Sequence, residues 1–589
     1  MTEVAPALLR EAFIDPIRFA LLIDDEFRSV DQLLEVNDLK AEDGDRLKGL
    51  FSFCREKGWL CDVEGDFKRI STDGVRGLHQ SDLLILDFHL DPSKQDDASA
   101  SINLIQKLEA SPHLNLVVVY TAADNIAQVA LDIGYGLGGG GKPPAGKWAD
   151  AKREELDDLA DRLGETSPSA GLLSAYISSD PKADSMMKFR ERLKDAGANN
   201  KSVDGMISII CSDFFAQRIS ETTLASRPSD TMVTIDIGSE VPWISAGNVF
   251  VAVVSKDHGP DQILDKLCLA LAAWKPSPLQ VMLIHARSAI EKAGAKYDHK
   301  VLESPVMQAA WILDVLSTES MGRARRLGDL YGNLFQRLSA ELQLSVGEFG
   351  RRLFESDPED KALILARAMS RVDDGIENHA IYHAANEFLC SDRPPESGRL
   401  TTGLIFRVAP AKKGGETQLF VCTTPNCDLV AGQNDRGWDA QLNPMKAAYV
   451  TRLRPVENDD FVPSLQDATQ GRHLYLTVDG RQRVYEFVDQ TTRQANLEVI
   501  FVGDEGRYSN DGFSGHVVRM AEEGPELQAT NFKVLAQLRP HYANKLLMDA
   551  GQQKARIGLA WLPMPKLPAP DPEVSEAGEA APELPAKTA

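Results

Sequence analysis

Two acidic sites near the start of the chain each follow a short apolar run. Asp24 and Asp25 come directly after the run FALLI, and Asp87 follows the run LLIL. Two or three carboxylates that meet at strand ends form a hard-oxygen site suited to Mg²⁺. One carboxylate can then attack phosphorus, since phosphoryl transfer needs chiefly an in-line nucleophile and neutralised phosphoryl oxygens. We therefore predict Asp87 as a phosphoryl acceptor, with Asp24 and Asp25 as its metal-holding partners.

This chemistry also calls for a hydroxyl and a lysine near the acceptor. The run LNLVVVYT ends on Thr121, and the run NVFVAVVSK ends on Lys256. A second lysine, Lys142, lies in GGGGKPP, but four glycines make a poor strand. We predict Lys256 as the site lysine and keep Lys142 as the alternative.

The elements that must position these residues are parallel strands. Continuous apolar runs are typical of strands covered on both faces, and functional groups gather beyond the carboxyl ends of such strands. A further short strand is expected at 59–63. The choice of Lys256 implies an insert at about residues 135–240, which we interpret as a surface elaboration or lid. Helices are expected in the insert at 147–163, 186–195 and 203–219.

The motifs Leu22-Ile23-Asp24-Asp25-Glu26, Leu86-Asp87 and Tyr120-Thr121-Ala122, with a strand-ending lysine, resemble the receiver domain of two-component response regulators. The resemblance covers residues 15–275 without the insert and implies a flavodoxin-like (βα)5 fold. It implies that Asp24 and Asp25 hold Mg²⁺ and that Asp87 takes a phosphoryl group from a histidine kinase. Thr121 and Lys256 would contact that group after transfer. His89 would offer its backbone carbonyl to the metal.

The sequence departs from the receiver pattern in three respects. Asp25 and Asp87 lie 62 residues apart, the connection between the fourth and fifth strands is enlarged, and Asp257 rather than proline follows the lysine. Two interpretations follow from the resemblance. The domain is either phosphorylated on Asp87, or it is an inactive receiver-like scaffold that binds protein partners.

Length and composition limit the class of protein. A chain of 589 residues predicts three or four domains, and its formal net charge of −23 disfavours broad binding to nucleic acid or anionic membrane. No apolar run approaches the roughly 18 residues of a membrane span, and the first residues lack a signal-peptide pattern, so we expect a cytoplasmic protein. Seven scattered cysteines predict reduced thiols.

Residues 276–391 carry mostly helical patterns, which we expect to bury a helical core. A kinase-docking or dimerising bundle is the alternative, and the oligomeric state is left open. His285, His379 and His383 lie on these helices. The last two have the i,i+4 spacing of a metal pair, but we do not favour a metal there.

Residues 400–562 change to short strands separated by turns, which predict a small β-barrel or rolled sheet after a linker at 392–399. Cys422 and Cys427 are expected to be buried structural cysteines; a thiol enzyme with His473 or His516 as its base is the alternative. Strands are expected at 404–409, 417–424, 473–478, 483–488 and 496–503, with a closing helix and strand within 534–562. Residues 563–589, rich in Pro, Ala and Glu, are expected to be disordered.

Together these features predict a multidomain α/β and α+β protein with an N-terminal receiver, a helical middle region and a β-rich C-terminal domain. We expect a phosphorelay protein whose partners are a histidine kinase and other signalling proteins, without enzymatic activity beyond gaining and losing the phosphoryl group. Its layout loosely resembles receiver proteins of bacterial anti-phage systems of the Detocs type, which trigger or buffer a toxic effector. No motif discloses the output activity.

Overall fold

A computed structural model of the chain describes residues 4–554 with gaps. The expected disordered tail at 563–589 and the strand expected within 555–562 lie outside the described residues. The chain divides into two units, Met1–Arg371 and Val372–Ala589. The segments left out between 4 and 554 are 28–40, 66–77, 79–80, 91–97, 110, 112–113, 164–166, 229–230, 298–303, 318–319, 356–361, 370–377, 409–416, 431–436, 489–494 and 510–511.

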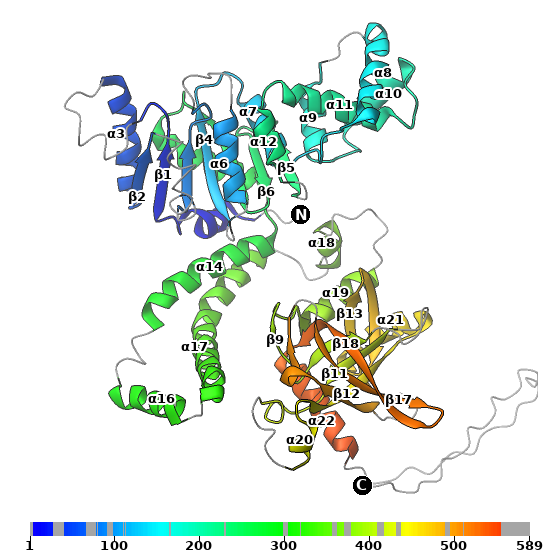
Figure 1. Ribbon diagram of the computed structural model, residues 1–589. Helices are drawn as coiled ribbons and strands as arrows, with labels where there is room; N and C mark the ends of the chain where they lie inside the picture. Colours follow the sequence, from blue (N-terminus) through cyan, green and yellow to red (C-terminus); the bar gives the residue numbers. More distant parts are fainter. Residues whose placement is uncertain are drawn as a thin grey trace, which may run out of the picture. The chain divides into compact units, whose positions relative to one another are not determined.

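A seven-stranded sheet forms the centre of the first unit (Figure 1). Five strands run parallel in the order β2-β1-β3-β4-β7, an order found in doubly wound α/β folds. The hairpin β5–β6, which the sequence did not predict, extends the β7 edge by two antiparallel strands. The strands are β1 Phe19–Ile23, β2 Leu60–Glu64, β3 Leu83–Leu86, β4 Asn115–Thr121, β5 Val233–Asp236, β6 Trp243–Ala246 and β7 Val249–Ser255.

Both faces of the sheet are buried, which explains the continuous apolar runs. In β1, Leu21 and Ile23 pack in one core with α6 and α7, whereas Ala20 and Leu22 pack in the opposite core with α1 and α13. Neither face of the central strands therefore has room for polar residues before the strands end. The covering elements are α1 Pro6–Leu9, η1 Arg10–Ile14, α3 Ala41–Glu56, α6 Ser99–Glu109, α7 Ile126–Gly136 and α13 Ile263–Trp274, the last preceded by η2 Pro260–Gln262.

The insert follows α7 as a group of helices that returns to the sheet through β5. Its buried residues, among them Leu173 and Phe215, belong to the same core as the α7 face of the sheet. An ion pair between the Arg153 and Asp213 side chains, 2.7 Å apart, joins two of its helices. The helices are α8 Lys147–Leu163, α9 Ala170–Ile177, α10 Asp184–Asp195, α11 Val203–Ala216 and α12 Glu221–Ala225.

The glycine run after α7 has a packing role. A Cβ on Gly139 would lie 2.4 Å from the side chain of Ile177, and one on Gly140 would lie 2.4 Å from the ring of Tyr176. Arg227 donates a hydrogen bond to the carbonyl of Gly139 at 2.6 Å. The run thus lets the backbone pass close to α9, and Lys142 follows it as an exposed residue.

The helices after the sheet are docked only in part. Phe349 and Leu353 near the end of α17 join the core beneath α13, and Arg352 pairs with Glu11 at 2.7 Å. By contrast, α16 has no buried residue, so within the described residues the expected helical core forms where α14 and the end of α17 pack together. The helices are α14 Pro278–Tyr297, α16 Pro305–Ser317, α17 Ser320–Phe354 and α18 Ala362–Met369; α19 Asn378–Cys390 belongs to the second unit.

The second unit contains a closed antiparallel barrel. Its six strands pair in the order β11-β10-β18-β17-β15-β12, and pairing of β12 with β11 closes the ring. The hairpin β13–β14 pairs with the end of β12, and α19 packs on β13. The barrel strands are β10 Leu404–Val408, β11 Gln418–Cys422, β12 Lys446–Pro455, β15 Leu497–Val502, β17 Phe513–Ala521 and β18 Gly524–Leu538; the hairpin is β13 His473–Val478 and β14 Arg481–Glu486.

Smaller elements complete this unit. The expected linker at 392–399 is partly structured, because β8 pairs with β18 and β9 pairs with β16. The expected closing helix is present as α22. The bounds are β8 Ser391–Asp392, β9 Gly398–Arg399, β16 Arg507–Tyr508, α20 Gly437–Leu442, η4 Asn458–Asp460, α21 Phe461–Gln466, η5 Ala468–Gln470, η6 Asp504–Gly506 and α22 Pro540–Lys554.

Within the part of the chain that the structure describes, no helix combines the length and the apolar character that crossing a membrane requires.

The docking of α17 can be tested with two phenylalanines of the same helix. Phe349 is 1% exposed and stacks on His285, so Phe349→Ala should lower the free energy of unfolding of the first unit by about 3–5 kcal/mol. Phe354 is 47% exposed, so Phe354→Ala should cost less than about 1 kcal/mol. Urea denaturation followed by circular dichroism measures both. Equal losses would contradict the docking of this helix.

Candidate functional site

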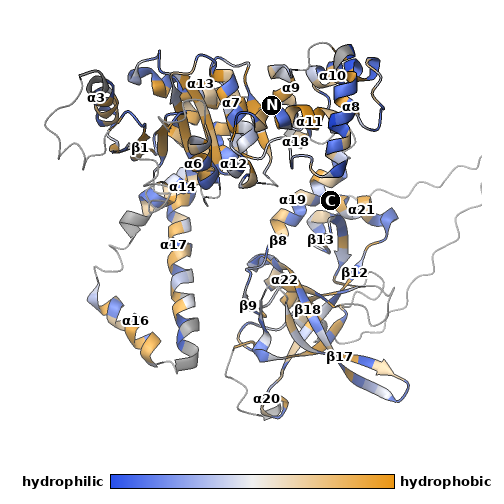
Figure 2. Ribbon diagram, turned by 45° about the horizontal axis from the view of Figure 1, so that its top comes forward, coloured by the Kyte–Doolittle hydropathy of each residue, from blue (hydrophilic) through white to orange (hydrophobic). Residues whose placement is uncertain are grey.

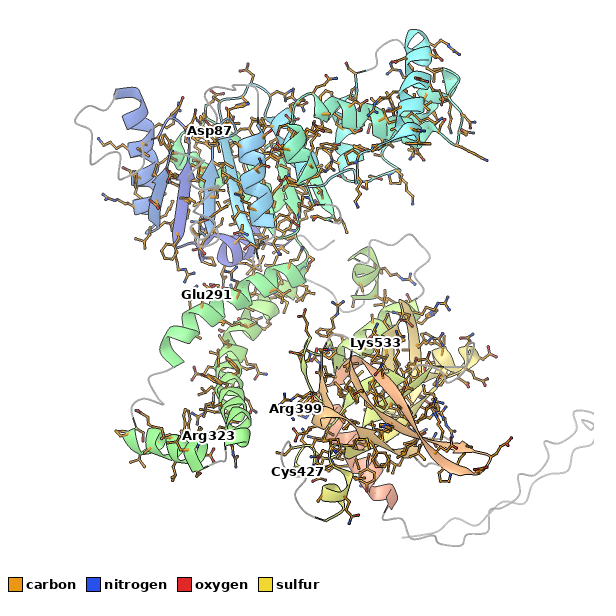
Figure 3. All side chains as sticks on the ribbon, viewed as in Figure 1. Asp87, Glu291, Arg323, Arg399, Cys427 and Lys533 are labelled. Atoms are coloured by element: carbon orange, nitrogen blue, oxygen red, sulfur yellow. The ribbon has the colours of Figure 1, made fainter. Side chains whose placement is uncertain are left out.

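The register of the parallel strands brings the predicted site residues together. Ile23 of β1 pairs with Leu86 of β3, so the next residues, Asp24 and Asp87, end their strands at the same level. Ligand oxygens of Asp24, Asp25 and Asp87 lie within 4.8 Å of one another. Asp24 and Asp25 follow the end of β1, and Asp87 follows the end of β3. These two paired strands therefore deliver three carboxylates to one edge of the sheet, where Figure 3 shows Asp87.

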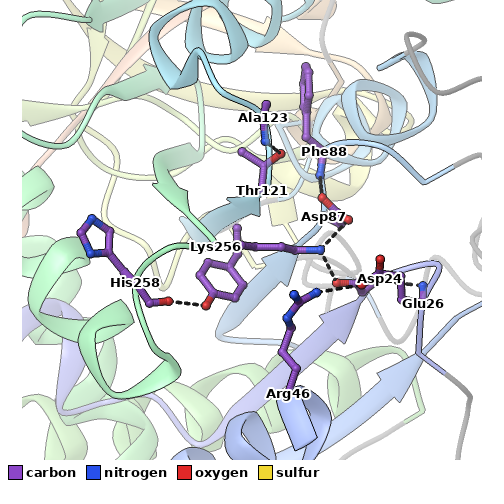
Figure 4. A network of polar contacts seen from close by, with 10 residues as sticks. Asp24, Glu26, Arg46, Asp87, Phe88, Thr121, Ala123, Lys256 and His258 are labelled. Atoms are coloured by element: carbon purple, nitrogen blue, oxygen red, sulfur yellow. Dashed lines mark hydrogen bonds and ion pairs between the residues drawn. The ribbon is translucent and has the colours of Figure 1, made fainter. Parts of the chain in front are cut away.

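Lys256 supplies the counter-charge for two of these carboxylates. Thr121 of β4 pairs with Ser255 of β7, which places Lys256 just beyond the strand end. Its Nζ lies 2.8 Å from Oδ2 of Asp24 and 2.7 Å from Oδ2 of Asp87 (Figure 4). The side chains of all three residues are almost completely buried. The alternative lysine, Lys142, is exposed in the turn that follows the glycine run.

Burial and charge set the protonation of the cluster. Burial raises the pKa of Asp87, and Asp24 adds to this, while Lys256 opposes it. Burial alone would lower the pKa of Lys256, but the charges of Asp24 and Asp87 outweigh it and the pKa is raised. Burial and the neighbouring carboxylates raise the pKa of Asp25 to about 6. The lysine therefore stays charged, whereas Asp25 is the carboxylate that most lacks a cationic neighbour.

Backbone groups fix the orientation of the two acids that bind the lysine. The N–H of Phe88 donates to Oδ1 of Asp87 at 2.6 Å, so that Oδ2 is the oxygen turned toward Lys256. Oδ1 of Asp24 accepts the N–H of Glu26 at 3.0 Å. Each carboxylate thus keeps one oxygen for the backbone and one for a cation or an incoming group.

Thr121 lies at the end of the strand next to Asp87, fully buried (Figure 4). Its Oγ1 accepts the N–H of Ala123 at 3.2 Å, and its carbonyl accepts the N–H of Lys256 at 2.7 Å. The hydroxyl proton of Thr121 is therefore not used in the bond to Ala123. Through its carbonyl, Thr121 links the end of β4 to the backbone of Lys256 after β7.

Sequence reasoning missed two polar links around the site. The hydroxyl of Tyr120 donates to the carbonyl of His258, which ties β4 to the loop after Lys256. Arg46 of α3 pairs with Glu26 at 2.8 Å. Tyr120 is adjacent to Thr121 in the sequence, but its partner is set by how the loop after β7 folds back. No local pattern would have indicated either contact.

The donor set fits a hard divalent cation. Asp24, Asp25 and Asp87 offer carboxylate oxygens, the ligands that Mg²⁺ prefers, and the ammonium of Lys256 already shows that this edge of the sheet attracts positive charge. His89 is partly buried, and its ring lies edge-on to that of Phe88 at 4.9 Å. The use of its backbone carbonyl as a ligand stays a prediction.

A comparison with known protein families supports the interpretation of this acidic cluster. Residues 16–156 match the family model of the response receiver domain. Residues 16–156 therefore belong to a receiver domain. No curated protein and no solved structure matches the chain. The receiver match contains the three acids and Thr121 but ends before Lys256, so the geometry, not the family match, places that lysine at the site.

The other histidines of interest lie outside the receiver site and have structural partners. Nε2 of His383 lies 2.9 Å from the carbonyl oxygen of Arg483, and the imidazole is buried and stacks on Phe461. The ring of His379 contacts Phe461 edge-on. His285 stacks on Phe349, and burial lowers its pKa. These contacts account for all three as packing residues.

The cysteines of the barrel differ from each other. Cys422 is buried as expected, but Cys427 is exposed, because it lies in the turn after β11 that begins at Pro425. Its thiol donates to Asp428 at 3.2 Å, and this bond raises the pKa of Cys427. A raised pKa opposes formation of the thiolate that a nucleophile requires. The structure therefore gives no support to a thiol enzyme at Cys427.

The role of Lys256 can be tested against the alternative lysine. Lys256→Met leaves Asp24 and Asp87 buried without a counter-charge, so the metal-free protein should lose about 3 kcal/mol of unfolding free energy. Magnesium should restore part of this loss, because a cation replaces the missing charge. Lys142→Met should change the stability by less than about 0.5 kcal/mol. Chemical denaturation with and without magnesium measures this, and a larger loss for Lys142→Met would contradict the assignment.

The raised pKa of Asp25 makes the stability of the fold depend on pH. The sign of this dependence is opposite to that expected for an acid in a salt bridge, whose pKa is lowered. The pKa of Asp25 rises from 3.8 to about 6 on folding, so the folded chain binds the proton more tightly and ionisation above about pH 6 destabilises it. Without metal, Asp25→Asn should therefore raise the unfolding free energy by about 1–2 kcal/mol near pH 8, after allowance for solvent screening. The gain should vanish as the pH falls from 6 toward 4. Thermal unfolding across this range measures it, and a gain that grows toward low pH would contradict the raised pKa.

Proposed function

We propose that this protein is a response-regulator-like signalling protein in which Asp87 accepts a phosphoryl group from a histidine kinase. The observation that carries the proposal is the position of Lys256, whose Nζ bridges Asp24 and Asp87 at the end of the sheet. This contact, together with the family match, supports a phosphoryl-acceptor site over a structural ion pair.

In the proposed reaction, a carboxylate oxygen of Asp87 forms a bond to phosphorus while the bond from phosphorus to the kinase histidine nitrogen breaks. Mg²⁺ held by Asp24, Asp25 and Asp87 would neutralise charge on the phosphoryl oxygens. The bond from Phe88 keeps Asp87 oriented, and Lys256 compensates the charge that the product adds. Thr121 has a hydroxyl proton to donate to a phosphoryl oxygen.

The signal would leave the site through the loops that carry Thr121 and Lys256. A phosphoryl group on Asp87 competes with Asp24 for the Lys256 ammonium, so the end of β7 would shift. The Tyr120–His258 hydrogen bond joins the loop after β7 to β4, and the loop leads into α13. The insert, which extends from α7, and the helices after α13 are the elements placed to respond.

An adaptor with an unphosphorylated receiver is the second candidate. It is favoured by the exposed apolar side chains of α16, which suit binding to another protein. Retained partner binding and function in Asp87→Ala would support the adaptor. Participation in an anti-phage system, a cytoplasmic location and the domain limits 15–275, 276–391, 400–562 and 563–589 are further proposals from the sequence.

Phosphoryl acceptance can be tested directly. Incubation with acetyl phosphate and magnesium should add one phosphoryl group to the wild-type chain, measured by intact-mass spectrometry, and chelation of magnesium should abolish it. Asp87→Asn should remain unmodified, because the amide is a poor nucleophile. Asp124→Asn, an exposed residue three positions after Thr121, is the matched control and should be modified as the wild type is. Equal modification of Asp87→Asn would sink the proposal.

A further inference from the structure

The helix α16 exposes an unusual amount of apolar surface for its length. None of its residues is buried, although Ile312, Leu313 and Leu316 are large aliphatic residues. Leu313 is 69% exposed. These three residues are spaced by one, three and four positions, so they form one side of the helix. A helix of this composition normally has that side covered by protein.

The adjoining helix α17 carries a second exposed apolar stripe. Leu327, Tyr331 and Phe335 recur every four residues, and all three are exposed, Phe335 by 66%. The rings of Tyr331 and Phe335 stack with their centroids 6.5 Å apart. Orange bands of hydrophobic residues recur along both helices in Figure 2. A solvent-exposed ion pair between Arg326 and Asp314, 3.8 Å apart, links α16 to α17.

We propose that the hairpin α16–α17 is a dimerisation surface that packs against the same hairpin of a second copy of this chain. We call the hairpin, residues 305–354, the helical arm. Each copy would contribute two helices, and the four would form a bundle with the two apolar stripes in its interior. A two-fold interface of this kind is self-complementary, because the same patch serves both copies.

The exposed apolar area of the helical arm is large enough for an interface with a second copy of the chain. A fully exposed aliphatic or aromatic side chain presents roughly 150–200 Å². The six exposed side chains named above therefore offer on the order of 600 Å² of apolar surface per copy, or about 1,200 Å² for two, which reaches the lower bound of stable interfaces. The largest exposed apolar patch of an ordinary monomer is of similar size and is often functional.

The charges along α17 favour an antiparallel pairing of two copies. Arg323 is exposed before the apolar stripe and Glu341 is exposed after it, whereas Arg326 and Glu348 pair within the arm with Asp314 and Arg351. A two-fold axis near the middle of the stripe brings Arg323 of one α17 near Glu341 of the other. Figure 3 shows Arg323 at the end of the arm remote from Asp87 in the first unit. The docked end of α17, which carries Phe349, would remain on its own sheet.

The oligomeric state of the full chain tests this proposal. Sedimentation of the wild type should give twice the monomer mass of 64.6 kDa. The double variant Tyr331→Glu/Phe335→Glu should weaken the dimer at least 100-fold, since it places four carboxylates in the bundle interior. Leu344→Glu is the matched control: Leu344 is 84% exposed on another side of the same helix, so this variant should remain a dimer.

Circular dichroism should show that each variant keeps the helical content of the wild type, because the replaced side chains are exposed in the single chain. The unfolding midpoint of the Leu344→Glu control should match that of the wild type, whereas loss of the dimer should lower that of the double variant. A wild-type mass of 64.6 kDa at all concentrations would overturn the proposal. So would equal dissociation of the Leu344→Glu control. A monomeric wild type that binds lipid vesicles or a kinase through Tyr331 and Phe335 would assign the arm to that partner instead. None of these outcomes depends on phosphorylation of Asp87.

Discussion

One buried ammonium group organises the functional end of the sheet. Lys256 lies between Asp24 and Asp87, and without it two carboxylates would be buried side by side with no compensating charge. Its ion pairs require that β1, β3, β4 and β7 all end at the same level. The parallel register provides that level, and the two buried faces of the sheet enforce the register.

The register of the parallel strands also explains how the chain tolerates a large insert inside the domain. The ion pair between Lys256 and Asp87 joins residues that lie 169 positions apart in the sequence. The helices of the insert begin after α7 and share its core, and the β5–β6 hairpin returns the chain along the edge of β7. The entropic cost of closing a loop grows only slowly with its length. The added residues therefore leave the strand ends where they are.

The sequence predicted the parts whose local pattern is decisive. Buried strands such as β4 appear as unbroken apolar runs, and the site acids and Lys256 directly follow such runs. The sequence did not predict β17 or β18, which have mixed polar and apolar sequences without a long apolar run and which pair with the distant strands β15 and β10 in the barrel. Tyr120 and Arg46 were missed because their partners are set by the packing of other elements. Residues 276–391 were expected to bury a helical core, but within the described residues of the helical arm only the end of α17 is buried, and α16 has no buried residue.

We propose Asp87 as the residue that carries the phosphoryl group, and its position can be determined chemically. Borohydride reduction of the phosphorylated protein converts an aspartyl phosphate to homoserine, whose position tandem mass spectrometry then identifies. We expect homoserine at position 87 alone, because the hydrogen bond from Phe88 and the ion pair with Lys256 orient Asp87 at the site. Homoserine at Asp24 or Asp25, or at an acid of another element, would contradict this proposal.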